Sequence, residues 1–182
     1  MENKDMHFSR PKGFMQLLKI RLLYREAFPR CERKPFSIIK AMVKRGKSDL
    51  WYFEDDGSFA GLVATINGND TILIDYLAVA KKRRGKGIGK SILSHMLDYY
   101  KDKGVFLEIE MPDETAENNQ ERIRRREFYL RSGLVPMNTF AKLFGVNMEL
   151  LGYNCHFTFD EYRDFYRENY GELAYNNIKP IE

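Results

Sequence analysis

The chain has 182 residues, a length that suits one domain with a buried core of ordinary size. A hydrophobic content of 43% and an aromatic content of 14% exclude a disordered chain, and a net charge of +4 is too small to indicate nucleic-acid binding. The N-terminus lacks an apolar signal core, and no apolar run is long enough to span a bilayer. We therefore expect one soluble, cytoplasmic domain over residues 1–182 that binds neither nucleic acid nor membrane.

Cysteine and histidine are too scattered to indicate a metal site. Cys31 and Cys155 lie far apart in the sequence and form no C-x-x-C or zinc spacing, so we expect two reduced thiols. His7, His95 and His156 belong to no His–carboxylate cluster with metal-ligand spacing. The sequence therefore predicts a protein without a metal.

The first third of the chain predicts two helices followed by strands. Residues 12–29 and 35–45 are apolar-rich segments bounded by proline or glycine, which is typical of short helices. Residues 50–54 and 58–66 read as strands that flank Asp55-Asp56-Gly57, a hairpin signal. With the next strand they form a predicted antiparallel meander.

Residues 72–80 are rich in Val, Ile and Leu, which favours a strand at a central position in a sheet. Apolar residues then recur at helical spacing from Ile88 onward. We expect this helix to end near Lys103, with Gly104 supplying a left-handed stop.

The last part of the chain alternates strands and helices. Residues 105–111 alternate as a strand does, and residues 117–132 predict a helix closed by Gly133. Two strand-like runs follow at 139–144 and 146–151. Thr158 to Glu161 form a capping box that opens a last helix, whose aromatic stripe we expect to pack in the core. These elements together predict an α/β domain with a mostly antiparallel sheet.

The turn after residue 80 is rich in glycine and in basic residues. A helix that begins Gly-Ile-Gly offers unbonded backbone N–H groups to an anion, and Gly87 and Gly89 lack the Cβ that would keep a phosphate away. The basic residues around this point are Lys81, Lys82, Arg83, Arg84, Lys86 and Lys90. The turn therefore predicts a polyphosphate site.

The spacing of the glycines selects among polyphosphate-binding motifs. A P-loop would need glycine where Arg84 stands, and a dinucleotide fingerprint would need wider spacing between its last glycines. Arg84-x-x-Gly87-x-Gly89, after a strand that contains Leu77 and Val79, resembles the pyrophosphate-binding signature of the GNAT N-acetyltransferase superfamily. Farther along the chain, a tyrosine four residues before a glycine, Tyr129-x-x-x-Gly133, is similar to a later helix ending of that family.

This resemblance implies a GNAT fold, in which helices flank a mixed, mostly antiparallel sheet and one parallel strand pair is splayed to hold acetyl-CoA. The pantetheine arm would pair with the backbone of the strand before the turn. The pyrophosphate would lie on the N–H groups of the turn. The implied cofactor-binding residues are Leu77, Ala78, Val79, Arg84, Gly85, Lys86, Gly87, Ile88, Gly89 and Lys90.

The chemistry of acetyl transfer to an amine needs a neutral amine and a protonated leaving thiol. Tyr129 matches the family position of the general acid, and its phenol carries a proton at neutral pH. Three carboxylates remain as alternatives for the base. Glu108 and Glu110 share one face of a strand that should be central, and Asp75 shares a face with Leu77 and Val79.

The resulting hypothesis is an acetyl-CoA-dependent N-acetyltransferase that acts on a primary amine of a small molecule or peptide. A catalytically silent acyl-CoA-binding module and a nucleotide- or nucleic-acid-binding protein remain as alternatives. A homodimer stays open, and the sequence does not indicate the acceptor amine. The run Arg122-Ile-Arg-Arg-Arg126 reads either as a solvated helix face or as a contact for phosphate or an acidic substrate.

Overall fold

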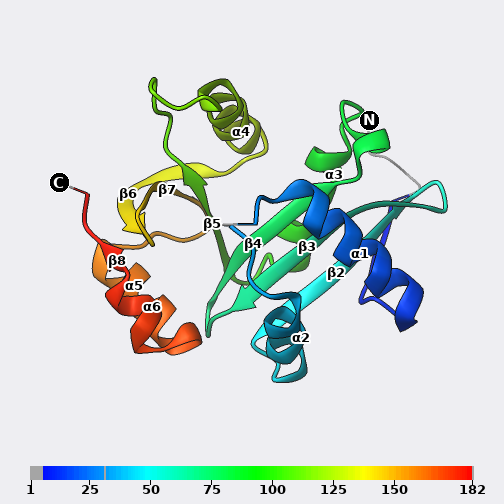
Figure 1. Cartoon of the computed structure of the whole chain (residues 1–182), viewed down its shortest axis with the longest axis horizontal. Coiled ribbons are helices and arrows are strands. Elements are labelled where there is room, and N and C mark those ends of the chain that lie inside the picture. The colour runs from blue at the N-terminus through cyan, green and yellow to red at the C-terminus, as the bar shows by residue number, and fades with distance from the viewer. Residues whose placement is uncertain (1–5, 31, 182) are drawn as a thin grey trace. The chain divides into compact units, whose positions relative to one another are not determined.

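The computed structural model describes residues 6–30 and 32–181 (Figure 1). These residues group into two compact units. Unit 1 contains residues up to Asn67 and Ile74–Tyr99, and unit 2 contains Gly68–Leu73 and the residues from Tyr100 onward. Strand β4 (Thr71–Val79) contributes to both, and the hydrogen-bonded strand order is β1-β2-β3-β4-β5-β7-β6-β8. The predicted mixed, mostly antiparallel α/β sheet is confirmed.

Unit 1 carries the two N-terminal helices and the predicted hairpin. Its elements are β1 (Met6–Ser9), α1 (Gly13–Ala27), α2 (Phe36–Lys44), β2 (Ser48–Asp55), β3 (Ser58–Asn67), the second half of β4, a short 3-10 helix η1 (Lys81–Arg83) and α3 (Ile88–Tyr99). The hairpin turns at Asp56 and Gly57, whose φ angles of 54° and 63° are those of a type I′ turn. Strand β1 was not predicted, because four residues are too few to show an alternation.

One part of the core of unit 1 lies between α1, α2 and one face of the sheet. Tyr76 and Ala78 of β4 point into it and pack with buried residues of both helices, Ile20, Leu23, Tyr24 and Ile39. Leu77 and Val79 alternate to the opposite face and are half-buried. In unit 1, one face of β4 is therefore fully packed and the other face is partly accessible.

Helix α3 packs very closely on β3, and Gly61 makes that approach possible. A Cβ at Gly61 would stand 2.6 Å from the carbonyl oxygen of Ala78 and 2.7 Å from Cδ1 of Ile92. No side chain fits there without moving backbone. The glycine therefore fixes where α3, and the turn that precedes it, sit in unit 1.

Unit 2 is built on β5, the hairpin β6–β7 and the C-terminal helices. Its elements are the first residues of β4, β5 (Gly104–Glu110), α4 (Asn119–Arg131), β6 (Val135–Leu143), β7 (Val146–Tyr153), α5 (Phe159–Tyr170), α6 (Glu172–Asn176) and β8 (Ile178–Lys179). The capping box at Thr158 and Glu161 is present as predicted. Helix α6 and strand β8 were not predicted, and β6 begins four residues earlier than expected.

The expected end of α3 was wrong. The helix stops at Tyr99, and Gly104 begins β5 instead of closing the helix. The N–H group of Gly104 donates to the carbonyl of Asp70 at 3.0 Å, and a Cβ at this position would collide with Cβ of Cys155. Glycine is needed here because another segment approaches closely, which a helix-stop pattern does not reveal.

One parallel pair interrupts the antiparallel sheet. Thr71–Leu73 of β4 are in register with Gly104–Phe106 of β5. On its other side, β5 pairs antiparallel with β7 from Val105 to Glu110. In the part of the chain that the structure describes, no helix is both long and apolar enough to cross a membrane.

Candidate functional site

The glycine turn of unit 1 has the backbone geometry of an open anion cradle. Arg84 is extended, and Gly85 and Gly87 have φ angles of 74° and 79°, a region that L side chains rarely adopt. Helix α3 begins at Ile88, which is 2% exposed and so anchors the first turn in the core. The sequence folds this way because glycine alone tolerates the two left-handed positions.

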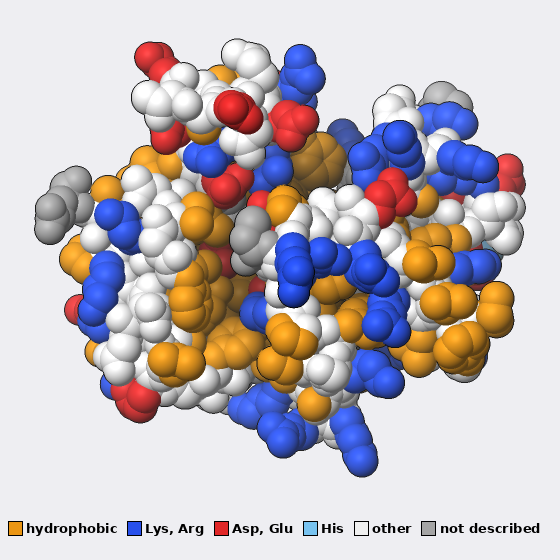
Figure 2. Space-filling model, viewed as in Figure 1, with side chains coloured by type: hydrophobic (Ala, Val, Ile, Leu, Met, Phe, Trp, Pro, Cys, Tyr) orange, Lys and Arg blue, Asp and Glu red, His pale blue; other side chains and the backbone are white. Residues whose placement is uncertain are grey.

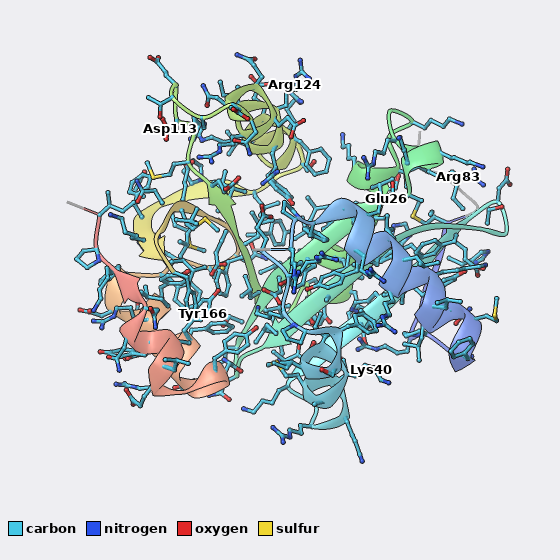
Figure 3. The ribbon with its side chains drawn as sticks, viewed as in Figure 1. Glu26, Lys40, Arg83, Asp113, Arg124 and Tyr166 are labelled. Atoms are coloured by element: carbon cyan, nitrogen blue, oxygen red, sulfur yellow. The ribbon has the colours of Figure 1, made fainter. Side chains whose placement is uncertain are left out.

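The backbone N–H groups of this turn are available to a ligand. Among residues 6–30 and 32–181, no backbone carbonyl accepts from the N–H groups of Gly85 to Lys90. The next N–H group, that of Ser91, donates to the carbonyl of Gly87 at 3.1 Å. Lysine and arginine side chains gather over this part of unit 1, near the labelled Arg83 (Figures 2 and 3). Its exposed cations are Lys81, Lys82, Arg84, Lys86 and Lys90.

Two of the basic residues have partners in unit 1. The Arg83 guanidinium donates to Oδ2 of Asp55 at 2.9 Å and to the carbonyl of Asp55 at 3.1 Å. Arg84 donates through Nε to the carbonyl of Val79 at 3.0 Å. Arg83 therefore ties the turn to the β2–β3 hairpin, and Arg84 ties it to the end of β4.

The candidate base Asp75 is held by an ion pair. Nζ of Lys34 lies 2.7 Å from both carboxylate oxygens of Asp75, and the two side chains are 27% and 9% exposed. On the next residue, the Tyr76 hydroxyl donates to the carbonyl of Glu32 and accepts from the N–H of Lys34. Asp75 and Tyr76 thus fasten the connection between α1 and α2 to β4.

The two tyrosines at this connection are strongly desolvated. Burial raises the pKa of Tyr76 well above its ordinary value, and the neighbouring Asp75 charge adds to the effect. Burial also raises the pKa of Tyr24, whose hydroxyl donates to the carbonyl of Lys34 at 3.0 Å. Both phenols therefore stay neutral and act as structural hydrogen-bond groups.

In unit 2, the Tyr129–Gly133 motif forms the end of α4. Gly133 has a φ of 100°, its N–H group donates to the carbonyl of Leu130, and the N–H group of Leu134 donates to the carbonyl of Tyr129. This is a Schellman motif, and its apolar residue Leu134 is 2% exposed. The spacing between tyrosine and glycine therefore has a local structural cause, and it fixes the place of Tyr129 on the last turn.

The Tyr129 phenol is half-buried and stays protonated at neutral pH. Burial raises its pKa above the ordinary 10.0, and the positive charge of Arg125 partly opposes this. Among the residues that the structure describes, none forms a hydrogen bond with the Tyr129 hydroxyl. The phenol can therefore donate its proton to a bound molecule without breaking a bond within the protein.

The arginines of α4 clamp it to the sheet of unit 2. Arg122 and Arg125 lie 3.4 and 3.7 Å from the two carboxylate oxygens of Glu110. Arg126 forms a bidentate pair with Glu149, at 2.7 and 3.0 Å. Arg124 is exposed and extends away from the helix (Figure 3). Most of this basic run is neither a solvated face nor a free anion site, because it neutralises carboxylates of β5 and β7.

Glu108 has partners of a different kind. Its Oε1 accepts hydrogen bonds from the hydroxyls of Tyr162 and Tyr166, each at 2.7 Å. Both tyrosines belong to the aromatic stripe of α5, and both are buried as predicted. Their contact with Glu108 was not predicted, although two buried phenols at i and i+4 need a polar partner and a strand carboxylate can supply it.

The predicted site residues thus fall into two groups. Asp75, Leu77, Ala78, Val79 and the turn 84–90 lie together in unit 1, whereas Glu108, Glu110 and Tyr129 belong to unit 2. In the described residues no group of three or more His, Cys, Asp or Glu side chains is arranged to hold a metal ion.

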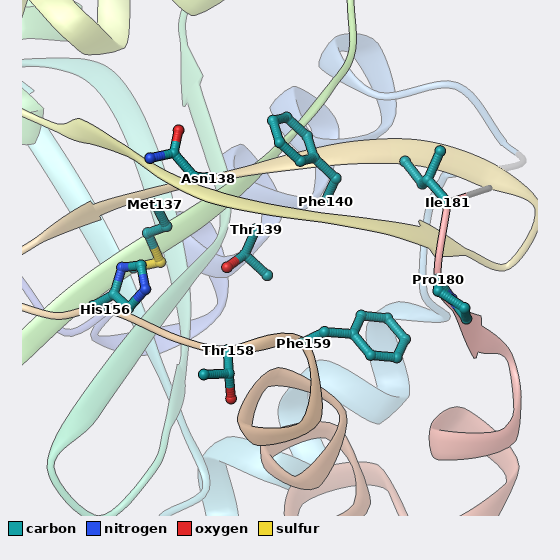
Figure 4. A pocket seen from close by; sticks show the side chains of 9 residues that line it. All are labelled: Met137, Asn138, Thr139, Phe140, His156, Thr158, Phe159, Pro180 and Ile181. Carbon is teal, nitrogen blue, oxygen red and sulfur yellow. The ribbon is translucent and has the colours of Figure 1, made fainter.

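Unit 2 also contains a groove that no prediction covered (Figure 4). It has a volume of about 640 Å³ and lies between the irregular part of β6, the segment after β7 and the segment after β8. Its lining residues are Met137, Asn138, Thr139, Phe140, His156, Thr158, Phe159, Pro180 and Ile181. None of the predicted site residues lines this groove.

Comparison with known proteins identifies the family of the chain. The family model described as "Acetyltransferase (GNAT) family" matches residues 17–133. YjbC of Bacillus subtilis (strain 168), a provisionally assigned acetyltransferase, is 33% identical over 106 residues, which are 58% of this chain and 51% of that protein. The chain thus matches about half the length of this curated relative.

Solved structures show the same fold. A provisionally assigned GNAT acetyltransferase from Bacteroides thetaiotaomicron superposes with a TM-score of 0.75 at 19% identity, covering 91% of this chain and 99% of that one. The dodecameric spermidine N-acetyltransferase of Vibrio cholerae superposes with a TM-score of 0.64 at 15% identity, covering 83% and 94%.

Proposed function

Since the chain belongs to the GNAT acetyltransferase family, we propose that it is an acetyl-CoA-dependent N-acetyltransferase acting on a primary amine of a small molecule or peptide. The observation that carries this proposal is the run of backbone N–H groups at Gly85–Lys90 without a partner in the described chain, at the start of α3. A pyrophosphate needs such donors, and the exposed lysines and Arg84 add positive charge. The residues present therefore fit the cosubstrate.

The backbone of Leu77, Ala78 and Val79 would hold the pantetheine arm of acetyl-CoA. Leu77 and Val79 present a half-buried face, which suits a ligand that adds along the strand. Arg84 to Lys90 would hold the pyrophosphate, with Gly85 and Gly87 allowing close approach of the phosphates. Bound acetyl-CoA would supply the activated acetyl group for transfer.

Tyr129 is the proposed general acid. Its raised pKa keeps the phenol protonated, and its hydroxyl has no partner among the described residues, so it can protonate the leaving thiolate. For the base, the contacts favour Glu108. Proton uptake by Asp75 or Glu110 would weaken their ion pairs with lysine or arginine, whereas Glu108 accepts hydrogen bonds from the phenols of Tyr162 and Tyr166.

Calorimetry of acetyl-CoA binding tests the placement of the cosubstrate. Gly89→Val puts a branched side chain into the first turn of α3, and we expect affinity to fall at least about tenfold because the N–H groups are covered. Ser94→Val is the matched control, since Ser94 is exposed on the same helix and serine and valine have similar helix propensities. Equal affinity in a folded Gly89→Val protein would contradict the proposal, and tighter binding of ATP than of acetyl-CoA would favour a nucleotide-binding protein.

CoA release with a panel of amines separates an enzyme from a silent acyl-CoA-binding module. The panel should contain polyamines, amino acids, peptides and aminoglycoside antibiotics, because the structural neighbour from Vibrio cholerae acts on spermidine. Once an acceptor is found, Tyr129→Phe should lower kcat by a factor on the order of 10² while leaving acetyl-CoA affinity nearly unchanged. An unchanged kcat would leave Tyr129 with a packing role only.

A further inference from the structure

Glu108 and two tyrosines of α5 form a buried hydrogen-bonded cluster in unit 2. Oε1 of Glu108 accepts both hydroxyls at 2.7 Å, and Tyr162 and Tyr166 are 0% and 3% exposed. Glu108 itself is only partly buried. Tyr166 lies on the inward side of α5, toward the strands of its unit (Figure 3). The carboxylate is therefore held from the protein side and remains partly accessible.

The packing of α5 fixes where the two hydroxyls lie. The capping box fastens the first turn of the helix, through Thr158 and Glu161. The rings of Tyr162 and Tyr166 meet edge to face with centroids 5.2 Å apart, and Tyr170 stacks on Tyr166 at 5.4 Å. Because neighbouring rings hold both tyrosine rings in place, their hydroxyls already point at Glu108 before any ligand binds.

Two neighbouring carboxylates are held by arginines of α4. Glu110 lies two residues along β5 and is neutralised by Arg122 and Arg125 of α4. Glu149 of β7 is opposite Ile109, on the other face of the sheet, and pairs with Arg126. Tyr170 of α5 also contacts the cluster, through the ring of Tyr166. Glu108 thus differs from the neighbouring carboxylates in accepting two phenol hydrogen bonds.

We propose that Tyr162 and Tyr166 are positioning residues for deprotonation of the acceptor amine, acting through Glu108. This inference rests on the proposed function. Glu108 takes one proton from the substrate ammonium, and the nitrogen lone pair then forms the N–C bond as the C–S bond breaks. The thiolate takes a proton from Tyr129, and the second proton lost by the nitrogen restores Tyr129 through solvent. Glu108 then releases its proton to solvent and returns to the ionised form.

The hydroxyls stabilise the ionised form of Glu108, because a carboxylate that accepts hydrogen bonds holds its charge more readily. Removing one hydroxyl should therefore raise the pH at which Glu108 loses its proton, by about one unit for each hydrogen bond to the charged group. The acidic limb of kcat/KM should move to higher pH in the same way, since it reports the base of the free enzyme.

The experiment compares Tyr162→Phe, Tyr166→Phe and the double variant with wild type. Each keeps its ring and loses only the hydroxyl. Tyr153→Phe is the control. Tyr153 is a half-buried tyrosine at the last residue of β7, whereas Met148 and Glu149 lie near the start of that strand. We expect the limb to move upward by about one unit in each single variant and further in the double variant, with no movement in the control.

A second measurement does not need turnover. The carboxyl carbon of Glu108 can be titrated by NMR in protein labelled with ¹³C-glutamate, with Glu108→Gln assigning the signal. Parallel upward shifts in the NMR midpoint and the rate limb support the inference. An unmoved NMR midpoint, or a moved midpoint with an unmoved limb in an active enzyme, overturns it and leaves the acetyltransferase activity standing. If wild type releases no CoA with any amine of the panel, the proposed function fails and this inference fails with it.

Discussion

Replacing Arg126 by methionine should loosen α4 while the rest of its unit stays folded. Arg126 donates to Glu149 through two nitrogens, at 2.7 and 3.0 Å, and Glu149 is 4% exposed. No residue of α4 is fully buried, and its apolar residues Ile123, Phe128 and Leu130 are only half-buried. The ion pair therefore carries a large share of the attachment of α4, and with it the position of Tyr129.

The size of the effect follows from the geometry. Unit charges about 4 Å apart attract by about 4 kcal/mol at an effective dielectric constant of about 20. The side chain of Arg126 is 34% exposed, so solvent screens part of this attraction, and desolvation offsets more. We expect the free energy of local opening of α4 to fall by about 2 kcal/mol, which corresponds to roughly 30-fold faster amide exchange in this helix.

Hydrogen exchange followed by mass spectrometry measures this opening directly. Arg131→Met is the matched control on the same helix, because Arg131 and Glu127 form an i,i+4 pair whose side chains are 69% and 54% exposed. Such a pair contributes about 0.5 kcal/mol or less. Equal exchange in the two variants would refute the reasoning. An equal rise across both units would mean global destabilisation instead of release of α4.

Three further predictions concern stability and reactivity. Gly61→Ala should lower the free energy of unfolding by about 1–3 kcal/mol in urea titrations, because the added Cβ meets the Ala78 carbonyl at 2.6 Å; an unchanged midpoint would contradict the packing. The raised pKa of Tyr76 means that its contribution to stability is complete below its ordinary pKa of 10.0 and is lost above it, as the unfolded chain ionises first. Tyr76→Phe should therefore flatten the fall in stability between pH 10 and 11 by up to about 1.4 kcal/mol, measured by urea unfolding. Burial raises the pKa of Cys155 from 9.0 to about 11, so in a Cys31→Ser protein its alkylation at pH 8 should be about 100-fold slower than that of an unperturbed thiol, and a normal rate would contradict this.

The parts of the fold that could be predicted are those with local causes. The ending of α4 is one example, since the left-handed position of Gly133 and the burial of Leu134 follow from neighbouring residues. The type I′ turn at Asp56-Gly57 is another. Strand β8 has only two residues and forms because Lys142 and Leu143 of β6 pair with it, which no periodicity could indicate.

The roles of the candidate carboxylates could not be ranked from the sequence, because their partners are distant along the chain. Glu108 meets hydroxyls 54 and 58 residues away, and Asp75 meets Lys34 at a separation of 41 residues. In the sequence, all three carboxylates are simply charged residues on predicted strands. In the structure, lysine or arginine pairs with Asp75 and Glu110, and two phenols donate to Glu108.

The irregular stretch of β6 has a consequence for self-association. The register with β7 shifts between Pro136 and Phe140, Asn138 adopts a φ of 57°, and Pro136 has no N–H group to offer. β8 already covers Lys142 and Leu143 at the outer side of the same strand. A second copy of the chain therefore finds no continuous row of backbone donors and acceptors along β6. Any dimer that forms at this edge must be held by side chains and not by an extended sheet, which also guards the protein against strand-to-strand aggregation there.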